Sequence, residues 1–104
     1  MRQRKMAGYD EIRRYKDDLI IIIRRYLPTA KIYLFDVQGF GCAYEKNLDI
    51  AIDVGHEIDA EVLTKIGKDI DALEIHCVID VLDLQVVYDT MRDHIMETGV
   101  LLSA

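Results

Sequence analysis

Residues 31–53 constrain the fold of this 104-residue chain more than any other stretch, because they place a glycine-containing loop between two strand-like segments. Residues 31–35 are apolar and aromatic, which is typical of a central strand. Residues 36–46 have no hydrophobic period and contain two glycines, which predicts a loop. In residues 47–53 aliphatic and polar side chains alternate. This alternation predicts a strand with one buried face and one polar face, and the polar face includes Asp49.

A helix is predicted over residues 9–27, where Pro28 ends it. Ile20 and Ile21 fall outside the stripe that would face the core, so this helix is apolar on more than one face. Such width indicates either deep burial or a contact with another subunit. The residues of the main stripe recur at helical spacing: Ile12, Tyr15, Leu19, Ile22, Ile23 and Tyr26.

Two more helices and a short extended segment are predicted in the second half of the chain. The first helix covers residues 58–73 and begins near Asp59, and the second covers residues 86–97. Gly99 stands where a helix C-terminus is capped. The apolar residues 100–102 are then predicted to be extended.

Residues 75–84 are apolar at both odd and even positions, which predicts an interior strand covered on both sides. Asp80 lies within this strand, and a carboxylate there is costly unless it is paired, hydrogen-bonded or bound to a metal. Asp53 and Asp83 are interpreted as exposed charges at strand ends. Asp80 is therefore, with Asp49, a candidate functional residue.

The order of these elements predicts an α+β fold, a small mixed β-sheet backed by helices, in the order α-β-loop-β-α-β-α. Residues 1–104 are expected to form one domain, with residues 1–7 as a flexible basic end. A chain of this length has too few residues to cover both faces of a wide sheet, which makes a partner chain plausible.

Charge and composition exclude several classes of function. The net charge of −6 argues against general nucleic-acid binding, although residues 1–31 carry a charge of +5. The longest apolar run has five residues, far too few to cross a bilayer, and no signal peptide is visible, so a cytoplasmic protein is expected. The two cysteines form no CxxC pair, and the three histidines lack metal-ligand spacing.

Four segments together resemble the minimal nucleotidyltransferases of the polymerase-beta-like superfamily: LFDVQGFG, NLDIAID, IDVLDL and MRDHIMETGVLL. Members of that family typically read LFGSRARG, then a DxD about nine residues after the Gly-Ser pair, then a third Asp in a VDVVDL-like strand and an LRxxIxxEGxxL tail. The resemblance covers nearly the whole chain, and the spacing is kept. It implies a nucleotidyltransferase-like fold.

The resemblance also implies the roles of particular residues. Asp49 matches the second carboxylate of the family and Asp80 the third, so both would be catalytic and would bind Mg²⁺, with Asn47 at the position of the first carboxylate. The phosphates of ATP would lie against the loop at the positions of the Gly-Ser turn and of the following glycines. These positions are Asp36, Val37, Gly39 and Gly41.

The chain departs from the family pattern at three of these positions. Asn47 replaces a carboxylate with a weaker ligand for Mg²⁺. Asp36 replaces the glycine and brings a negative charge to the triphosphate, which at about 4 Å costs about 4 kcal/mol at an effective dielectric constant near 20. Val37 removes the serine hydroxyl. Weak MgATP binding or none is expected, unless Asp36, Asp49 and Asp80 form a different carboxylate cluster.

Two functions follow from the resemblance. The first is nucleotidyl (AMP) transfer from ATP to a hydroxyl, with Mg²⁺ and ATP as cofactors. The second is a non-catalytic, antitoxin-like binding module without a cofactor. Small family members resemble the antitoxins of two-component systems, whose partner is a helical HEPN ribonuclease. The expected partner is thus a HEPN-type protein or a second copy of the chain.

Overall fold

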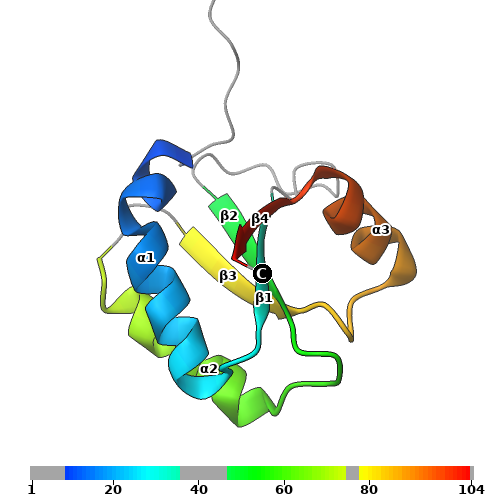
Figure 1. Ribbon diagram of the computed structural model, residues 1–104, viewed down its shortest axis with the longest axis horizontal. Coiled ribbons are helices and arrows are strands. Elements are labelled where there is room, and N and C mark those ends of the chain that lie inside the picture. Colours follow the sequence, from blue (N-terminus) through cyan, green and yellow to red (C-terminus); the bar gives the residue numbers. More distant parts are fainter. Residues whose placement is uncertain (1–8, 36–46, 75–77, 104) are drawn as a thin grey trace, which may run out of the picture.

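The computed structural model describes residues 9–35, 47–74 and 78–103. These described residues form three helices and four strands (Figure 1). Their order confirms the predicted α+β fold, and the last strand confirms that residues 100–102 are extended. The elements are α1 (Tyr9–Tyr26), β1 (Lys31–Phe35), β2 (Asn47–Asp53), α2 (Ala60–Asp71), β3 (Val78–Asp83), α3 (Asp89–Thr98) and β4 (Val100–Ser103).

The strands form one mixed sheet in the order β3-β2-β1-β4. β1 pairs antiparallel with both β2 and β4, while β2 pairs parallel with β3. The prediction that residues 31–35 form a central strand is therefore confirmed. The prediction of an interior strand over residues 75–84 is wrong for Val78–Asp83, because β3 lies at the edge of the described sheet and Asp80 is exposed there. Residues 75–77 lie outside the described residues.

Helices cover both faces of the sheet (Figure 1). α1 and α2 pack on one face, where the buried strand residues are Ile32, Leu34, Ile50 and Ile52. α3 lies on the other face, where Ile95 packs with Phe35 and Ala51. Odd and even positions of β1 and β2 thus enter different cores, as the alternation of a strand requires.

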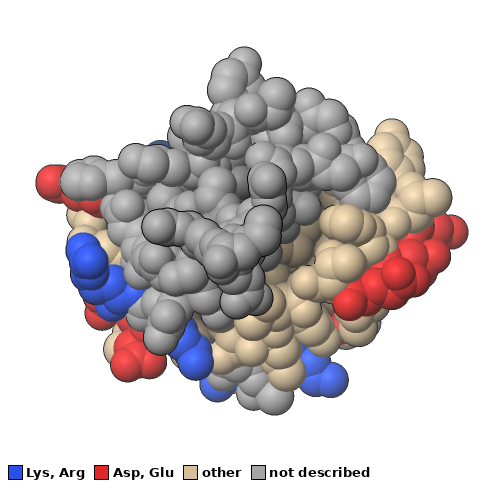
Figure 2. Space-filling model, turned by 90° about the horizontal axis from the view of Figure 1, so that it is seen from above, with Lys and Arg blue, Asp and Glu red and all other residues tan. Residues whose placement is uncertain are grey.

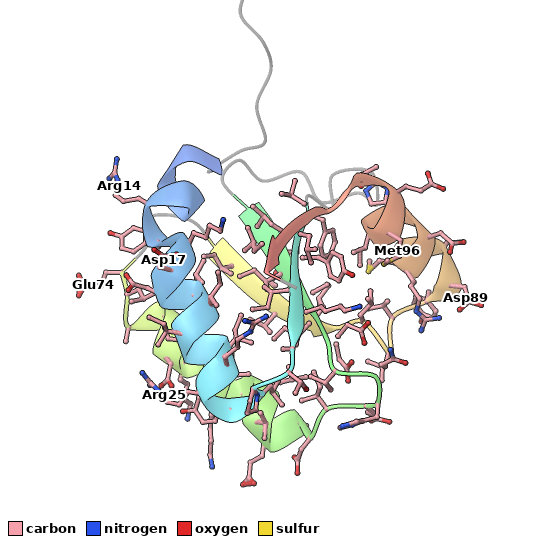
Figure 3. All side chains as sticks on the ribbon, in the orientation of Figure 1. Arg14, Asp17, Arg25, Glu74, Asp89 and Met96 are labelled. Atoms are coloured by element: carbon pink, nitrogen blue, oxygen red, sulfur yellow. The ribbon has the colours of Figure 1, made fainter. Side chains whose placement is uncertain are left out.

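α1 presents its predicted apolar stripe to the larger core. Leu19 and Ile23 are fully buried, and Ile20 packs partly against the same cluster. Ile21 points away from it, with 57% of the side chain exposed. The wide apolar surface of this helix is therefore divided between the core and one exposed isoleucine. The charged residues labelled in Figure 3 on α1 are Arg14, Asp17 and Arg25.

The ends of α2 and α3 have local causes. Asp59 is the N-cap of α2 and accepts a hydrogen bond from the backbone N–H of Glu61 at 2.9 Å, which agrees with the predicted start of this helix near Asp59. α3 begins at Asp89 rather than at residue 86, because residues 84–87 form a turn that continues from β3. Gly99 ends α3 as predicted, and its N–H donates to the carbonyl of Ile95 at 2.7 Å. None of the described helices is both long and apolar enough to cross a bilayer.

Candidate functional site

Asp49 and Asp80 are partners in the register between β2 and β3. These strands run parallel, so residues at matching positions project from the same face of the sheet, about 4.8 Å apart along the hydrogen-bonding direction. That face is the one covered by α3, since Asp49 shares the parity of Ala51 along β2. The structure therefore brings together the two carboxylates that the sequence singled out.

Phe35 completes this row of the sheet on the other side of Asp49. It is the register partner of Asp49 on β1 and is fully buried. Asp49 is itself 3% exposed, whereas Asp80 is exposed at the edge of the sheet. The pair thus has one carboxylate in the protein interior and one open to solvent.

Two carboxylates on neighbouring strands repel each other unless a cation or a proton lies between them. Oxygen ligands on two adjacent strands also suit a hard dication such as Mg²⁺, which takes one or two protein carboxylates and completes its shell with water and phosphate oxygens. Within the described part of the chain, no group of three or more His, Cys, Asp or Glu side chains could hold a metal. The donors that the structure shows there are therefore the two aspartates.

The remaining predicted site residues are not all placed. Asp36, Val37, Gly39 and Gly41 lie outside the described residues. Asn47 is the first residue of β2 and the register partner of Val78. The predicted phosphate-binding loop and the carboxylate cluster that would include Asp36 therefore stay predictions.

Asp83 was interpreted as an exposed strand-end charge, and that interpretation is wrong. Its side chain is 3% exposed. One carboxylate oxygen accepts the backbone N–H of Ile58 at 2.7 Å, and the other accepts that of Gln85 at 2.9 Å. Asp83 thereby joins the C-terminal end of β3 to the segment that precedes α2. Ile58 is 25 positions away in sequence, so no local pattern could reveal this role.

Arg92 is a second structural residue that the sequence did not single out. Its guanidinium donates to the backbone carbonyls of Leu84 and Gln85, at 3.1 Å each, and to the carboxylate of Asp89 at 3.2 Å. These contacts hold the turn between β3 and α3. The only sequence signal is the arginine in the MRDHI segment, which the family pattern shares.

The exposed face of α3 is acidic. Asp89, Asp93 and Glu97 are exposed and recur every four residues, so they form one stripe along the helix. Figure 2 shows acidic side chains gathered in a band on this side of the molecule. Met96 is also exposed on α3, and Figure 3 shows it together with Asp89. A positively charged partner surface would be attracted to this stripe.

No family model matches the chain, and no curated protein matches it significantly in sequence. Solved structures do match it in three dimensions. One is the complex of tri-AMPylated Shewanella oneidensis HEPN toxin with MNT antitoxin, where the TM-score is 0.69, the identity 21%, and the match covers 88% of this chain and 71% of that one.

Two further complexes match equally well. A toxin–antitoxin structure with AMP-PNP has a TM-score of 0.67 and 21% identity, over 86% of this chain and 73% of that one. The toxin–antitoxin pair MntA–HepT has a TM-score of 0.68 and 20% identity, over 88% and 72%. Similarity at this level of identity shows the fold. The three helices and the mixed four-stranded sheet of this chain therefore have the nucleotidyltransferase-like fold of MntA, as the resemblance in sequence predicted.

Proposed function

We propose that this chain is a minimal nucleotidyltransferase of the antitoxin type, which binds MgATP weakly and transfers AMP slowly to a hydroxyl of a HEPN-type partner protein. The observation that carries the proposal is the register match between Asp49 and Asp80. It supports the proposal because the resemblance in sequence assigns these same two neighbouring carboxylates to catalytic positions of the family pattern. The structural neighbours support the same class, since one is a complex with AMP-PNP and another contains an AMPylated HEPN toxin.

Both aspartates would hold Mg²⁺, and their difference in exposure would give Asp80 the additional role of proton acceptor. Asp49, 3% exposed and beside Phe35, would be a fixed metal ligand at the inner end of the site. Asp80 is exposed, so an acceptor hydroxyl could approach it from solvent. When bound, Mg²⁺ would neutralise the charge of the phosphates and orient them.

The reaction would be an in-line displacement at the α-phosphorus of ATP. The acceptor oxygen forms a bond to this phosphorus, its proton passes to the Asp80 carboxylate, and pyrophosphate leaves with the electrons of the broken bond. Three substitutions relative to the family pattern would slow this chemistry: Asn47 supplies a weaker ligand, Asp36 repels the triphosphate and Val37 offers no hydroxyl.

A second function is favoured by the burial of Asp49. A metal ligand needs access to a hydrated ion, and a side chain with 3% exposure offers little. On that ground the chain would be a non-catalytic antitoxin that neutralises its partner by binding alone. The acidic stripe of Asp89, Asp93 and Glu97 would then be a candidate contact for a basic surface of the partner.

Incubation with labelled ATP, Mg²⁺ and a purified HEPN-type candidate partner separates the two functions. Slow labelling of the partner that is lost in Asp49→Ala and in Asp80→Ala supports transfer. Asp71→Ala is the matched control, because this aspartate is exposed at the end of α2, away from both the Asp49–Asp80 pair and the acidic stripe of α3, and should leave labelling unchanged. A stable complex without label supports the binding module, and the absence of both label and complex contradicts both functions.

A further inference from the structure

The edge of the sheet formed by β4 is a candidate interaction surface that the proposed transfer reaction does not use. β4 pairs with β1 on one side, and no described strand pairs with it on the other. Figure 1 is viewed onto this edge, with β4 drawn in front of β1. An edge strand presents unpaired backbone N–H and C=O groups, which another strand can bind.

β4 has no charged residue and no proline, two features that often protect an edge, although it has only four residues and its pairing with β1 is irregular at one point. Within the segment Val100–Ser103, Val100 and Leu101 are 39% and 48% exposed. Both residues are in regular register with β1, because the irregularity in the pairing lies beyond Leu101. The opposite edge differs, since β3 carries the exposed carboxylate of Asp80. Charges of this kind discourage strand pairing.

We propose that β4 pairs antiparallel with β4 of a second copy of this chain, so that two sheets join into one of eight strands. A two-fold axis makes such a contact self-complementary, because each strand supplies the donors and acceptors that the other needs. Identical strands without charges meet no like-charge repulsion there. Pairing through β3 would instead bring the carboxylates of both copies together, which selects the β4 edge for the dimer.

The dimer leaves the Asp49–Asp80 pair accessible. β2 and β1 separate β3 from β4, so Asp80 lies on the outer edge of the sheet in each copy. The dimer would therefore carry two sites at opposite ends, and its formation depends on neither nucleotide nor partner. Failure of the transfer reaction would leave this inference intact, and the reverse also holds.

The contact is expected to be weak and to respond to salt in a particular direction. A strand of four residues buries less than the area of about 1,200 Å² at which specific interfaces begin. A dissociation constant of about 10–100 µM is therefore expected for the dimer. Each copy has a net charge of −6, which opposes association at low ionic strength. Added salt should therefore tighten the dimer.

Sedimentation velocity of the full chain over a range of concentrations tests the proposal. The unmodified chain should pass from monomer to dimer, and Leu101→Lys should weaken the dimer by about tenfold or more. Val86→Lys is the matched control, because Val86 is 57% exposed in the turn before α3, outside β4, and should dimerise normally. A folded Leu101→Lys variant that dimerises as well as the unmodified chain would overturn the proposal, as would a monomer at all concentrations up to about 500 µM.

Hydrogen exchange gives a second readout that needs no variant. In the dimer, the backbone N–H groups of β4 that face outward gain hydrogen-bond partners. Their exchange should slow as the protein concentration rises, while exchange in β3 stays constant. Slowing in β3 instead of β4, or none in either strand, would overturn the proposed pairing.

Discussion

Asp49 and Asp80 occupy matching positions on the parallel strands β2 and β3, yet Asp49 is 3% exposed and Asp80 is exposed. The pairing follows from the register of two strands that the sequence marks by alternation and by apolar content. The difference in exposure follows from the order of the sheet, because β2 is flanked on both sides whereas β3 forms an edge. The buried carboxylate of Asp49 suits a fixed metal ligand, and the exposed carboxylate of Asp80 suits a proton acceptor.

The first prediction concerns the buried carboxylate of Asp83. Asp83→Ala removes the acceptor of the Ile58 N–H, which is in a buried contact, and that of the Gln85 N–H. Leaving such a donor without a partner costs about 1–3 kcal/mol, so the free energy of unfolding should fall by about that amount. Urea denaturation measures the change. Asp93→Ala, which removes an exposed carboxylate, should change the unfolding free energy by less than about 0.5 kcal/mol.

The second prediction compares two glycines. A Cβ added at Gly99 would lie 2.5 Å from the carbonyl oxygen of Ile95, so Gly99→Ala forces backbone atoms apart and should destabilise the fold by about 1–3 kcal/mol. Gly67 lies inside α2 with no atom within 4 Å of such a Cβ, so Gly67→Ala should stabilise it by about 0.5–1 kcal/mol. Thermal unfolding of both variants checks the signs, and equal effects at the two positions would contradict the packing at Gly99.

The third prediction concerns the contact between α1 and α2. The Tyr26 hydroxyl donates a hydrogen bond of 2.7 Å to the carboxylate of Asp69, and this bond raises the pKa of Tyr26 above its ordinary value. The bond is present while the phenol is protonated. Its contribution to stability is therefore complete below the pKa of an unfolded tyrosine and is lost as the pH rises through the higher folded pKa.

An NMR titration of the tyrosine rings measures this shift. Asp69→Asn should lower the pKa of Tyr26 toward its ordinary value, since it replaces a negative acceptor with a neutral amide. An unchanged pKa for Tyr26 in this variant would show that Asp69 does not cause the shift.

The fourth prediction tests the interpretation of the departures from the family motif. The triple variant Asp36→Gly, Val37→Ser and Asn47→Asp restores the family pattern in the loop and at the start of β2. Removing one charge near the triphosphate and adding one metal ligand should tighten MgATP binding by about tenfold or more. Calorimetric titration of both proteins measures the gain. Equal affinities would show that these positions do not face the nucleotide.

Local sequence patterns predicted most of the elements but not the position of every strand. Alternation fixed residues 47–53 as a strand, and the glycine at position 99 fixed the end of α3. The apolar run over residues 75–84 predicted an interior strand, yet β3 lies at an edge, because such a run reports coverage of the faces and not the presence of a neighbour on each side.

The sequence predicted the two candidate carboxylates but not the pairing between the strands that carry them. The spacing of Asp49 and Asp80 within their strands made them candidates, and the parallel pairing then brought them together. The burial of Asp83 could not be foreseen, because it depends on Ile58, a residue 25 positions away. The start of α3 was missed by three residues for a similar reason, since contacts from Arg92 hold the preceding turn.

The central claim is that Asp49 and Asp80 together bind the magnesium complex of ATP, and backbone NMR during a titration with MgATP tests it most directly. The claim predicts that signals of β2 and β3 around these two residues shift, and that the shifts disappear in Asp49→Asn and in Asp80→Asn but persist in Asp93→Asn. Shifts confined to other parts of the molecule, or identical shifts in all three variants, would contradict it.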